Sequence, residues 1–170
     1  MNSSIKIIDQ NLITYSINEE DKTASVVGSK SYSDVIFIPH HINHDMREYV
    51  VISISENAFV GIENMKSIQF PPDSEIRTIE KNAFGDSGIE SITIPSKLVD
   101  LKDEWCSGTE KLTKINVSSK NPCYAQYQND FIIGKSSPEK ETFDVLVFCS
   151  RDIENISIPN FIEIISPYAF

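Results

Sequence analysis

The sequence has few of the residues that hold small or metal-dependent folds together. It contains only three cysteines and six glycines among 170 residues. Cys106, Cys123 and Cys149 match neither the spacing of a zinc ribbon nor that of a redox C-x-x-C pair. Buried free thiols are the simplest interpretation. A disulfide between Cys123 and Cys149 is the alternative if the protein is extracellular, because both cysteines fall in one excursion from the repeats described below.

Long apolar runs are also missing. No stretch approaches the roughly 20 apolar residues of a membrane-spanning helix, so we expect no membrane span in this segment. The N-terminal segment Met1–Asp9 lacks the basic start and the apolar run of a signal peptide. We therefore expect either a cytoplasmic protein or a processed piece of a longer one.

Positive charge is scarce. Fifteen basic residues stand against 25 acidic ones, which gives a net charge of −10. No segment gathers lysine and arginine into a patch that could neutralise phosphates, so the sequence predicts no nucleic-acid partner.

Catalytic motifs are absent as well. The sequence has neither a G-x-S-x-G turn nor a glycine-rich phosphate loop. Its only histidines, His40, His41 and His44, lie close together and with Asp45 are candidate ligands for zinc or nickel. The alternative is three exposed side chains in a loop after a strand. We expect a protein that is not an enzyme and that binds no cofactor.

What the sequence does contain is an internal repeat. Ile54–Phe59, Ile79–Phe84 and Ile165–Phe170 each read isoleucine, three mostly polar residues, alanine and phenylalanine. Leu101–Cys106 fits the same frame, with tryptophan and cysteine in the last two places. Another apolar residue stands three places before each of these segments: Val51, Ile76, Leu98 and Ile162.

A second motif precedes each of these tails. It reads I-x-I-P, mostly with another apolar residue three places earlier, and its last copy but one lacks the proline. The copies are Ile36–Pro39, Ile68–Pro71, Ile92–Pro95, Ile115–Ser118 and Ile156–Pro159. Alternation places both isoleucines on one face of a short strand, and proline ends the strand because it cannot donate to a ladder. One coil cannot bury its apolar side alone, so the copies must stack.

The spacing of the repeats lies within the roughly 20 to 29 residues of leucine-rich repeats. The sequence thus predicts a leucine-rich-repeat solenoid of the α/β horseshoe class, with mainly short β-strands, helical or 3-10 turns, and about five coils over residues 33–170. The rhythm breaks at residues 120–152, where Phe131–Ile133 and Phe143–Phe148 flank a turn-rich segment and predict an inserted β-hairpin. Residues 1–32 predict an N-terminal β-hairpin, formed by Leu12–Ile17 and Thr23–Val27, that caps the first coil.

These paired motifs resemble the BspA-like leucine-rich repeats, which occur in surface proteins of bacteria and of parasitic protists. The resemblance runs from about residue 12 to the end, and Val117–Tyr124 is similar to an insertion that the family often carries. Trp105-Cys106, in place of Ala-Phe, is a departure. The resemblance implies a protein-binding module of the surface antigen or adhesin type, at the cell surface or extracellular, whose partner is a host or extracellular matrix protein such as fibronectin. The alternative is an intracellular scaffold for protein–protein interaction or self-assembly.

Stacked strands would align their outward residues in columns on a concave face. The middle residues of the I-x-I motifs are Phe37, Gln69, Thr93, Asn116 and Ser157, and their neighbours are Val35, Ser67, Ser91, Lys114 and Asn155. We predict that this face binds a protein; ordinary exposed strand residues are the alternative. Asn116 and Asn155, like Asn2, begin glycosylation sequons, and a glycan on the face would compete with binding.

The sequence finishes at Phe170, the last residue of a repeat tail. An apolar coil end without a cap predicts either a fragment of a longer protein or end-to-end self-association.

Overall fold

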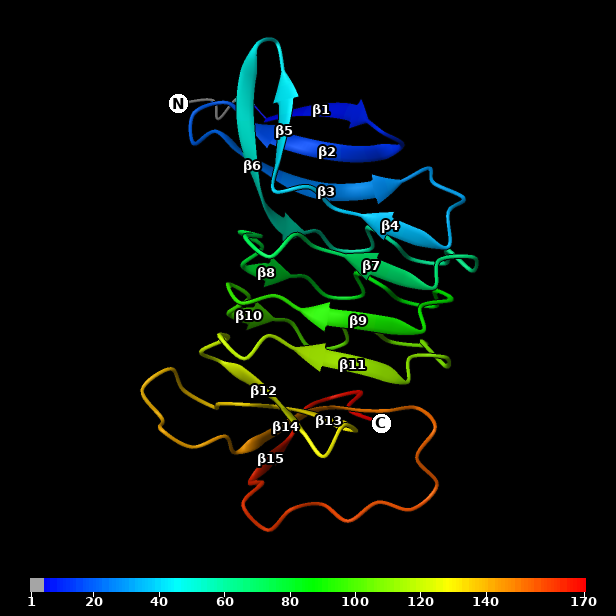
Figure 1. The fold of residues 1–170 in the computed structure, drawn as a ribbon, viewed down its shortest axis with the longest axis vertical. Helices are drawn as coiled ribbons and strands as arrows, with labels where there is room; N and C mark the ends of the chain where they lie inside the picture. The colour runs from blue at the N-terminus through cyan, green and yellow to red at the C-terminus, as the bar shows by residue number, and fades with distance from the viewer. Residues whose placement is uncertain (1–4) are drawn as a thin grey trace.

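The computed structural model describes residues 5–170, which form three β-sheets. Two of them run side by side along the long axis of the molecule, and the third lies at its C-terminal end (Figure 1). The sheets contain seven, four and four strands, and the described residues contain no helix. The connections between strands are turns and bends. The helical or 3-10 turns expected from the sequence are therefore not confirmed.

The I-x-I motifs build a four-stranded parallel sheet, called the first ladder here. Its strands, in spatial order, are β11 (Lys114–Val117), β9 (Ser91–Ile94), β7 (Ser67–Gln69) and β4 (Val35–Phe37). The first isoleucine of each motif pairs with its counterpart on the next strand and is buried. Each coil thus lays one short strand against the previous one, as the alternation predicts.

The fifth copy of the motif does not join this ladder. Ile156–Pro159 forms no strand, and Ile156 and Ile158 are each 40% exposed. The backbone carbonyls next to β11 with which a fifth strand would begin its pairing already have donors. The amide of Arg151 donates to Leu112 O, and the Ser150 hydroxyl donates to Thr113 O. The solenoid therefore has about four turns rather than five.

The V-x-x-I segments form a second parallel ladder. It consists of β6 (Arg47–Ile54), β8 (Thr78–Ile79) and β10 (Asp100–Leu101), and β3 (Thr23–Ser29) pairs with β6 in parallel. Two apolar residues spaced by three do not alternate like a strand, so the sequence motif alone did not indicate these strands.

The N-terminal strands complete the seven-stranded sheet. β1 (Ile5–Gln10), β2 (Ile13–Asn18) and β3 pair antiparallel, and β5 (His41–His44) pairs antiparallel with β6. The turn between β2 and β3 is held by the Asn18 side chain, whose Oδ1 accepts the amides of Glu20 and Asp21. The β2–β3 pair occupies the residues in which the sequence predicts a hairpin.

The remaining strands form a C-terminal sheet. β12 (Tyr124–Tyr127), β13 (Phe131–Gly134) and β14 (Val145–Cys149) are antiparallel, and β15 (Ile164–Ile165) pairs in parallel with β14. The β14–β15 pairing has the same form as the β6–β8 pairing of the second ladder. β14 thus supplies the strand on which the last tail stacks, since the fourth coil has no tail of its own.

Each tail turns through a residue with positive φ. Asn57, Asn82, Glu104 and Tyr168 occupy the same place in their coils, with φ of 59°, 54°, 62° and 60°. Asparagine tolerates this left-handed region better than most residues. Asn82 Nδ2 also donates to Asn57 Oδ1 at 2.7 Å, which joins the turns of two coils.

A column of buried aromatic rings runs along the core. Phe59 and Phe84 stack with centroids 5.4 Å apart, Phe84 meets Trp105 edge-on at 6.0 Å, and Trp105 lies 5.7 Å from Phe148 of β14. The amide of Phe84 donates to Trp105 O, just as that of Phe59 donates to Ala83 O. Trp105 and Cys106 thus keep the backbone register of the alanine and phenylalanine in the other tails. The indole of Trp105, at the alanine position, takes the place in the column that a phenylalanine ring fills in the other coils.

Asn121 joins the C-terminal sheet to the coil before it. Its buried Nδ2 donates to Pro95 O at 2.7 Å and Leu98 O at 2.8 Å, and its Oδ1 accepts the amides of Cys123 and Tyr124 at 2.8 Å. All four bonding positions of the side-chain amide are used. A single asparagine therefore fixes the direction in which the chain leaves the fourth coil.

The Tyr124 hydroxyl ends the second ladder. It accepts the amide of Leu101 on β10 at 2.9 Å, a donor that a further parallel strand would otherwise use. Burial raises the pKa of Tyr124 to about 12, so the hydroxyl stays protonated at neutral pH.

All three cysteines have free thiols. Cys149 lies opposite Phe131, which lies opposite Tyr127, four positions along the chain from Cys123. At a rise of about 3.3 Å per residue, Cys123 and Cys149 are at least about 13 Å apart. A disulfide requires Cα atoms within about 7 Å, so the bridge considered from the sequence is wrong. Burial raises the pKa of the Cys106 thiol to about 12, which keeps it protonated and unreactive.

Across residues 5–170 there is no helix with the length and apolarity to cross a membrane.

Candidate binding surface

The outward side of the first ladder carries the residues that the sequence proposes as a binding face. Phe37 lies opposite Gln69, and Thr93 lies opposite Asn116, in the parallel register of the ladder. Lys114 lies beside this column on β11, opposite Ser91. The structure therefore brings together Phe37, Gln69, Thr93, Asn116 and Lys114, all of which are exposed.

Ser157 is not part of this column. It lies in the fifth copy of the motif, which the contacts of residues 150 and 151 exclude from the ladder. Asn155 is exposed in the same irregular segment, whereas Asn116 is exposed on β11. Asn2, the third sequon, lies outside the described residues.

The chemistry of this face is that of a contact surface. Three strands contribute amide or hydroxyl side chains, Lys114 adds one positive charge at one end, and Phe37 adds an aromatic ring, 54% exposed, at the other. Such groups can donate and accept hydrogen bonds and bury one aromatic anchor. None of the five side chains is a carboxylate, an imidazole or a thiol.

A cavity of about 350 Å³ adjoins the Phe37 end of the face. The strand β4 forms one wall and residues of the N-terminal strands form the other. The lining residues are Asn11, Ile13, Tyr15, Ser31, Val35, Ile36, Phe37 and Pro39. Sequence reasoning found Phe37 but missed the cavity, because the N-terminal wall is distant in sequence and no motif marks it.

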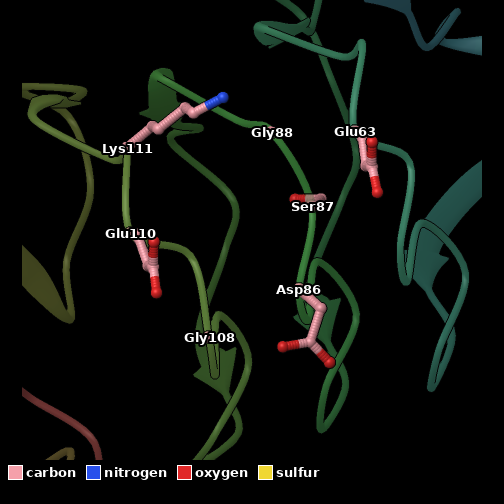
Figure 2. Close-up of a pocket in the computed structure, with 7 residues that line it drawn as sticks. All are labelled: Glu63, Asp86, Ser87, Gly88, Gly108, Glu110 and Lys111. Atoms are coloured by element: carbon pink, nitrogen blue, oxygen red, sulfur yellow. The ribbon is translucent and has the colours of Figure 1, made fainter.

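A second depression, of about 280 Å³, lies on the turn side of the solenoid. Figure 2 shows Glu63, Asp86, Glu110 and Lys111 on the turns of successive coils around it. Gly88 forms part of its wall because the coils approach closely there: a Cβ at this residue would lie 1.8 Å from Glu63 O. The carboxylates around this depression form no group of three that could hold a metal ion, and no such group occurs elsewhere in the described residues.

The histidines do not converge on a shared site. His41 and His44 lie on β5 rather than in a loop, and each histidine has its own acidic neighbour. His40 Nδ1 lies 3.1 Å from Asp73, and His41 Nε2 lies 3.3 Å from Glu48. His44 Nε2 lies 3.1 Å from Asp45, but without the alignment of a hydrogen bond. The structure therefore does not bring the candidate ligands together: residues 5–170 hold no group of three or more histidine, cysteine, aspartate or glutamate side chains that could hold a metal ion.

Two parallel ladders, stacked coil on coil around a shared core, define a solenoid of the leucine-rich-repeat type that consists mostly of strands. The chain belongs to the BspA type leucine rich repeat family, whose model matches residues 41–132, more than half of the chain, in six copies. Membership of this family indicates a protein-interaction or surface module.

Solved structures of bacterial leucine-rich-repeat proteins resemble this chain in fold at low identity. A leucine-rich repeat protein from Eubacterium ventriosum has a TM-score of 0.52 and 14% identity over 95% of this chain and 55% of its own. The pneumococcal vaccine antigen PcpA has a TM-score of 0.48 and 17% identity over 97% of this chain and 62% of its own. A leucine rich cell surface protein from Faecalibacterium prausnitzii has a TM-score of 0.37 and 14% identity over 95% and 66%.

The chain therefore spans less than two thirds of the length of each of these three proteins. No curated protein matches it in sequence.

Proposed function

We propose that this chain is a non-enzymatic protein-binding module that acts at the cell surface, as an adhesin or antigen, by holding a host or matrix protein against the first ladder. The observation that carries the proposal is the exposed column from Phe37 to Asn116, which continues across all four coils. Membership of the BspA-type family supports the surface role.

The dimensions of the column suit a contact with a folded protein. Four strands spaced about 4.8 Å apart give a column about 14 Å long. Side chains with hydroxyl and amide groups leave the surface soluble when no partner is bound, and the Phe37 ring offers the kind of aromatic anchor that dominates binding energy at interfaces. Specificity then comes from the hydrogen bonds of Gln69, Thr93 and Asn116.

The test is binding to immobilised fibronectin, the matrix protein that the family resemblance suggests. We expect the double variant Phe37→Glu, Gln69→Glu to bind at least tenfold more weakly, with an unchanged melting temperature because both side chains are exposed. The matched control is Met46→Glu, Asn43→Glu, which adds the same charge to exposed positions on the β5–β6 hairpin. Equal loss in both double variants would refute the placement of the site.

An intracellular scaffold that uses the same face is the alternative proposal. Antibody labelling of intact cells without permeabilisation separates the two roles. Surface labelling supports the adhesin, and labelling that appears only after permeabilisation supports the scaffold.

A second proposal concerns self-association through the last coil. Ile165 and Phe170 are 48% and 57% exposed, whereas Ile79 and Phe84, at the same repeat positions, are fully buried by the next coil. We propose that two copies of this chain associate end to end through the exposed side chains of Ile165 and Phe170. Light scattering should show a dimer that Ile165→Asp converts to a monomer, and a monomer at every concentration would contradict the proposal.

We also propose a division of the chain into parts. Residues 1–32, of which 1–4 lie outside the described residues, belong to the N-terminal β-hairpin cap, and residues 33–170 carry the repeats, with the hairpin excursion at residues 120–152 inserted among them.

A further inference from the structure

The first ladder has an open edge at β4. The spatial order of the sheet ends at this strand, which within residues 5–170 pairs only with β7. Toward β7, Asp34 O accepts the amide of Ser67 and the amide of Ile38 donates to Gln69 O. Backbone groups alternate in direction along a parallel strand, so those of Val35 and Phe37 point to the other side, where no strand of residues 5–170 lies. On that side the Val35 amide donates to Ser33 Oγ at 3.3 Å, which leaves the Val35 carbonyl and the amide and carbonyl of Phe37 for a further strand.

Little blocks this edge. Open edges in soluble proteins are usually guarded by lysine, by an inward-pointing charge or by a covering segment. The outward side chains of β4 are instead Val35 and Phe37, both exposed. The nearest charge, Asp34, is engaged by Lys66 at 3.0 Å on the side of β7.

A hollow with a partly apolar wall lies along the same edge. The 350 Å³ cavity runs between β4 and the N-terminal strands, where Ile13 and Tyr15 form part of its wall. Its volume falls within the roughly 300–1,000 Å³ of ligand pockets. Within the ladder, the central isoleucine of one strand lies beside the central isoleucine of the next strand, and Ile68 lies beside Ile36 in this way.

We propose that β4 receives an extended peptide segment of the partner protein, which adds a fifth parallel strand to the first ladder and places one central apolar side chain in the cavity beside Ile13 and Tyr15. The occupant is a strand because only an extended backbone matches the alternating Val35 carbonyl and Phe37 amide and carbonyl along this edge. The added strand continues a pairing that the ladder already makes three times. This inference rests on the proposed function and specifies the form of its partner.

The probe is a synthetic hexapeptide, Glu-Ser-Ile-Thr-Ile-Pro, that copies residues 90–95. In the ladder, Glu90 O and Ile94 O accept amides from the following strand, so by alternation the backbone of the central isoleucine, Ile92, also faces that strand. Two versions of the peptide are compared. One is N-methylated at the central isoleucine, which faces β4 when bound, and the other at the threonine, which faces away.

Binding is followed by nuclear magnetic resonance of the backbone amides. We expect the unmodified peptide to shift the Phe37 amide and to slow its hydrogen exchange at least tenfold at saturation. Methylation at the isoleucine should weaken binding about tenfold, the equivalent of one hydrogen bond, whereas methylation at the threonine should change it less than twofold. Equal affinities of the two methylated peptides would overturn the inference.

Two protein variants give an independent check. Phe37→Ala removes the ring, whereas Phe37→Pro removes the ring and the amide donor at a position where an edge strand tolerates proline. We expect Phe37→Pro to bind the peptide at least fivefold more weakly than Phe37→Ala, and equal affinities would count against strand addition.

The outcomes separate this inference from the proposed function. Shifts confined to Gln69, Thr93 and Asn116 would show that the peptide lies on the face; the binding face would then stand and strand addition would fail. Absence of peptide binding would also refute strand addition, and the fibronectin assay would decide the function by itself.

Discussion

Exchanging the residues of the third tail tests how the aromatic column is built. In the coils before it, alanine precedes a buried phenylalanine, whereas the third tail has Trp105 and Cys106 in these places. We consider Trp105→Ala, Cys106→Phe and the double variant, which restores Ala-Phe. The hydrogen bond from the Phe84 amide to residue 105 O already holds this tail in the register of the others.

The magnitudes follow from the packing. Trp105→Ala removes a ring that lies 6.0 Å from Phe84 and 5.7 Å from Phe148, which should cost about 3–5 kcal/mol. Cys106→Phe inserts a ring at a site that is already filled, with Arg151 Nη2 3.9 Å from the sulfur, and should cost about 1–3 kcal/mol. In the double variant the new ring can stack on Phe84 as Phe84 stacks on Phe59. The double variant should therefore be more stable than Trp105→Ala alone, with a favourable coupling of about 2–3 kcal/mol.

The assay is urea-induced unfolding followed by far-ultraviolet circular dichroism for the four proteins of the cycle. If the two single costs add within about 0.5 kcal/mol, the reasoning is refuted. The position of the ring would then be set by the contact with Phe148 and not by the register of the repeat.

Two further predictions concern the C-terminal sheet. Asn121→Leu should lower the free energy of unfolding by about 2–4 kcal/mol in the same urea-induced unfolding assay, because it leaves the buried carbonyls of Pro95 and Leu98 without donors. Asn121→Asp keeps the acceptor for the amides of Cys123 and Tyr124 but loses the same two donors, so it should be destabilised as well; a stability equal to that of the unchanged protein would refute the role of the donors. Hydrogen bonds from Lys140 first, and then from Ser136, lower the pKa of Asp144 from 3.8 to about 2. A carboxyl group whose pKa is lower in the folded than in the unfolded state stabilises the fold at pH values above its unfolded pKa. The free energy of unfolding should therefore fall as the pH drops from about 4 to about 2. Asp144→Asn should flatten that part of the pH profile, and an equally steep profile in the variant would exclude this role.

The first ladder could be predicted from the sequence because the determining pattern is local. Alternation around Ile36, Ile68, Ile92 and Ile115 predicts buried strands, and the structure places all four in one parallel sheet. Most of the outward column, from Phe37 to Asn116, follows from the same alternation.

The failures of the prediction have tertiary causes. Ile156–Pro159 carries the same motif, yet residues 150 and 151 occupy the edge that it would need. The strand β5, which contains two of the histidines, depends on its pairing with β6 and not on its own composition. The cavity beside β4 needs Ile13 and Tyr15 from the N-terminal strands, a contact that no spacing within the repeat could reveal.

The position of Trp105 has a spectroscopic consequence. It is the only tryptophan of the chain, and its indole lies between Phe84 of the second tail and Phe148 of the C-terminal sheet. Fluorescence emission from such an apolar site should be blue-shifted. Separation of the C-terminal sheet from the coils would expose the indole to water and shift its emission to the red. The molecule thus carries, without labelling, an optical reporter of the junction between its regular coils and the sheet that follows them.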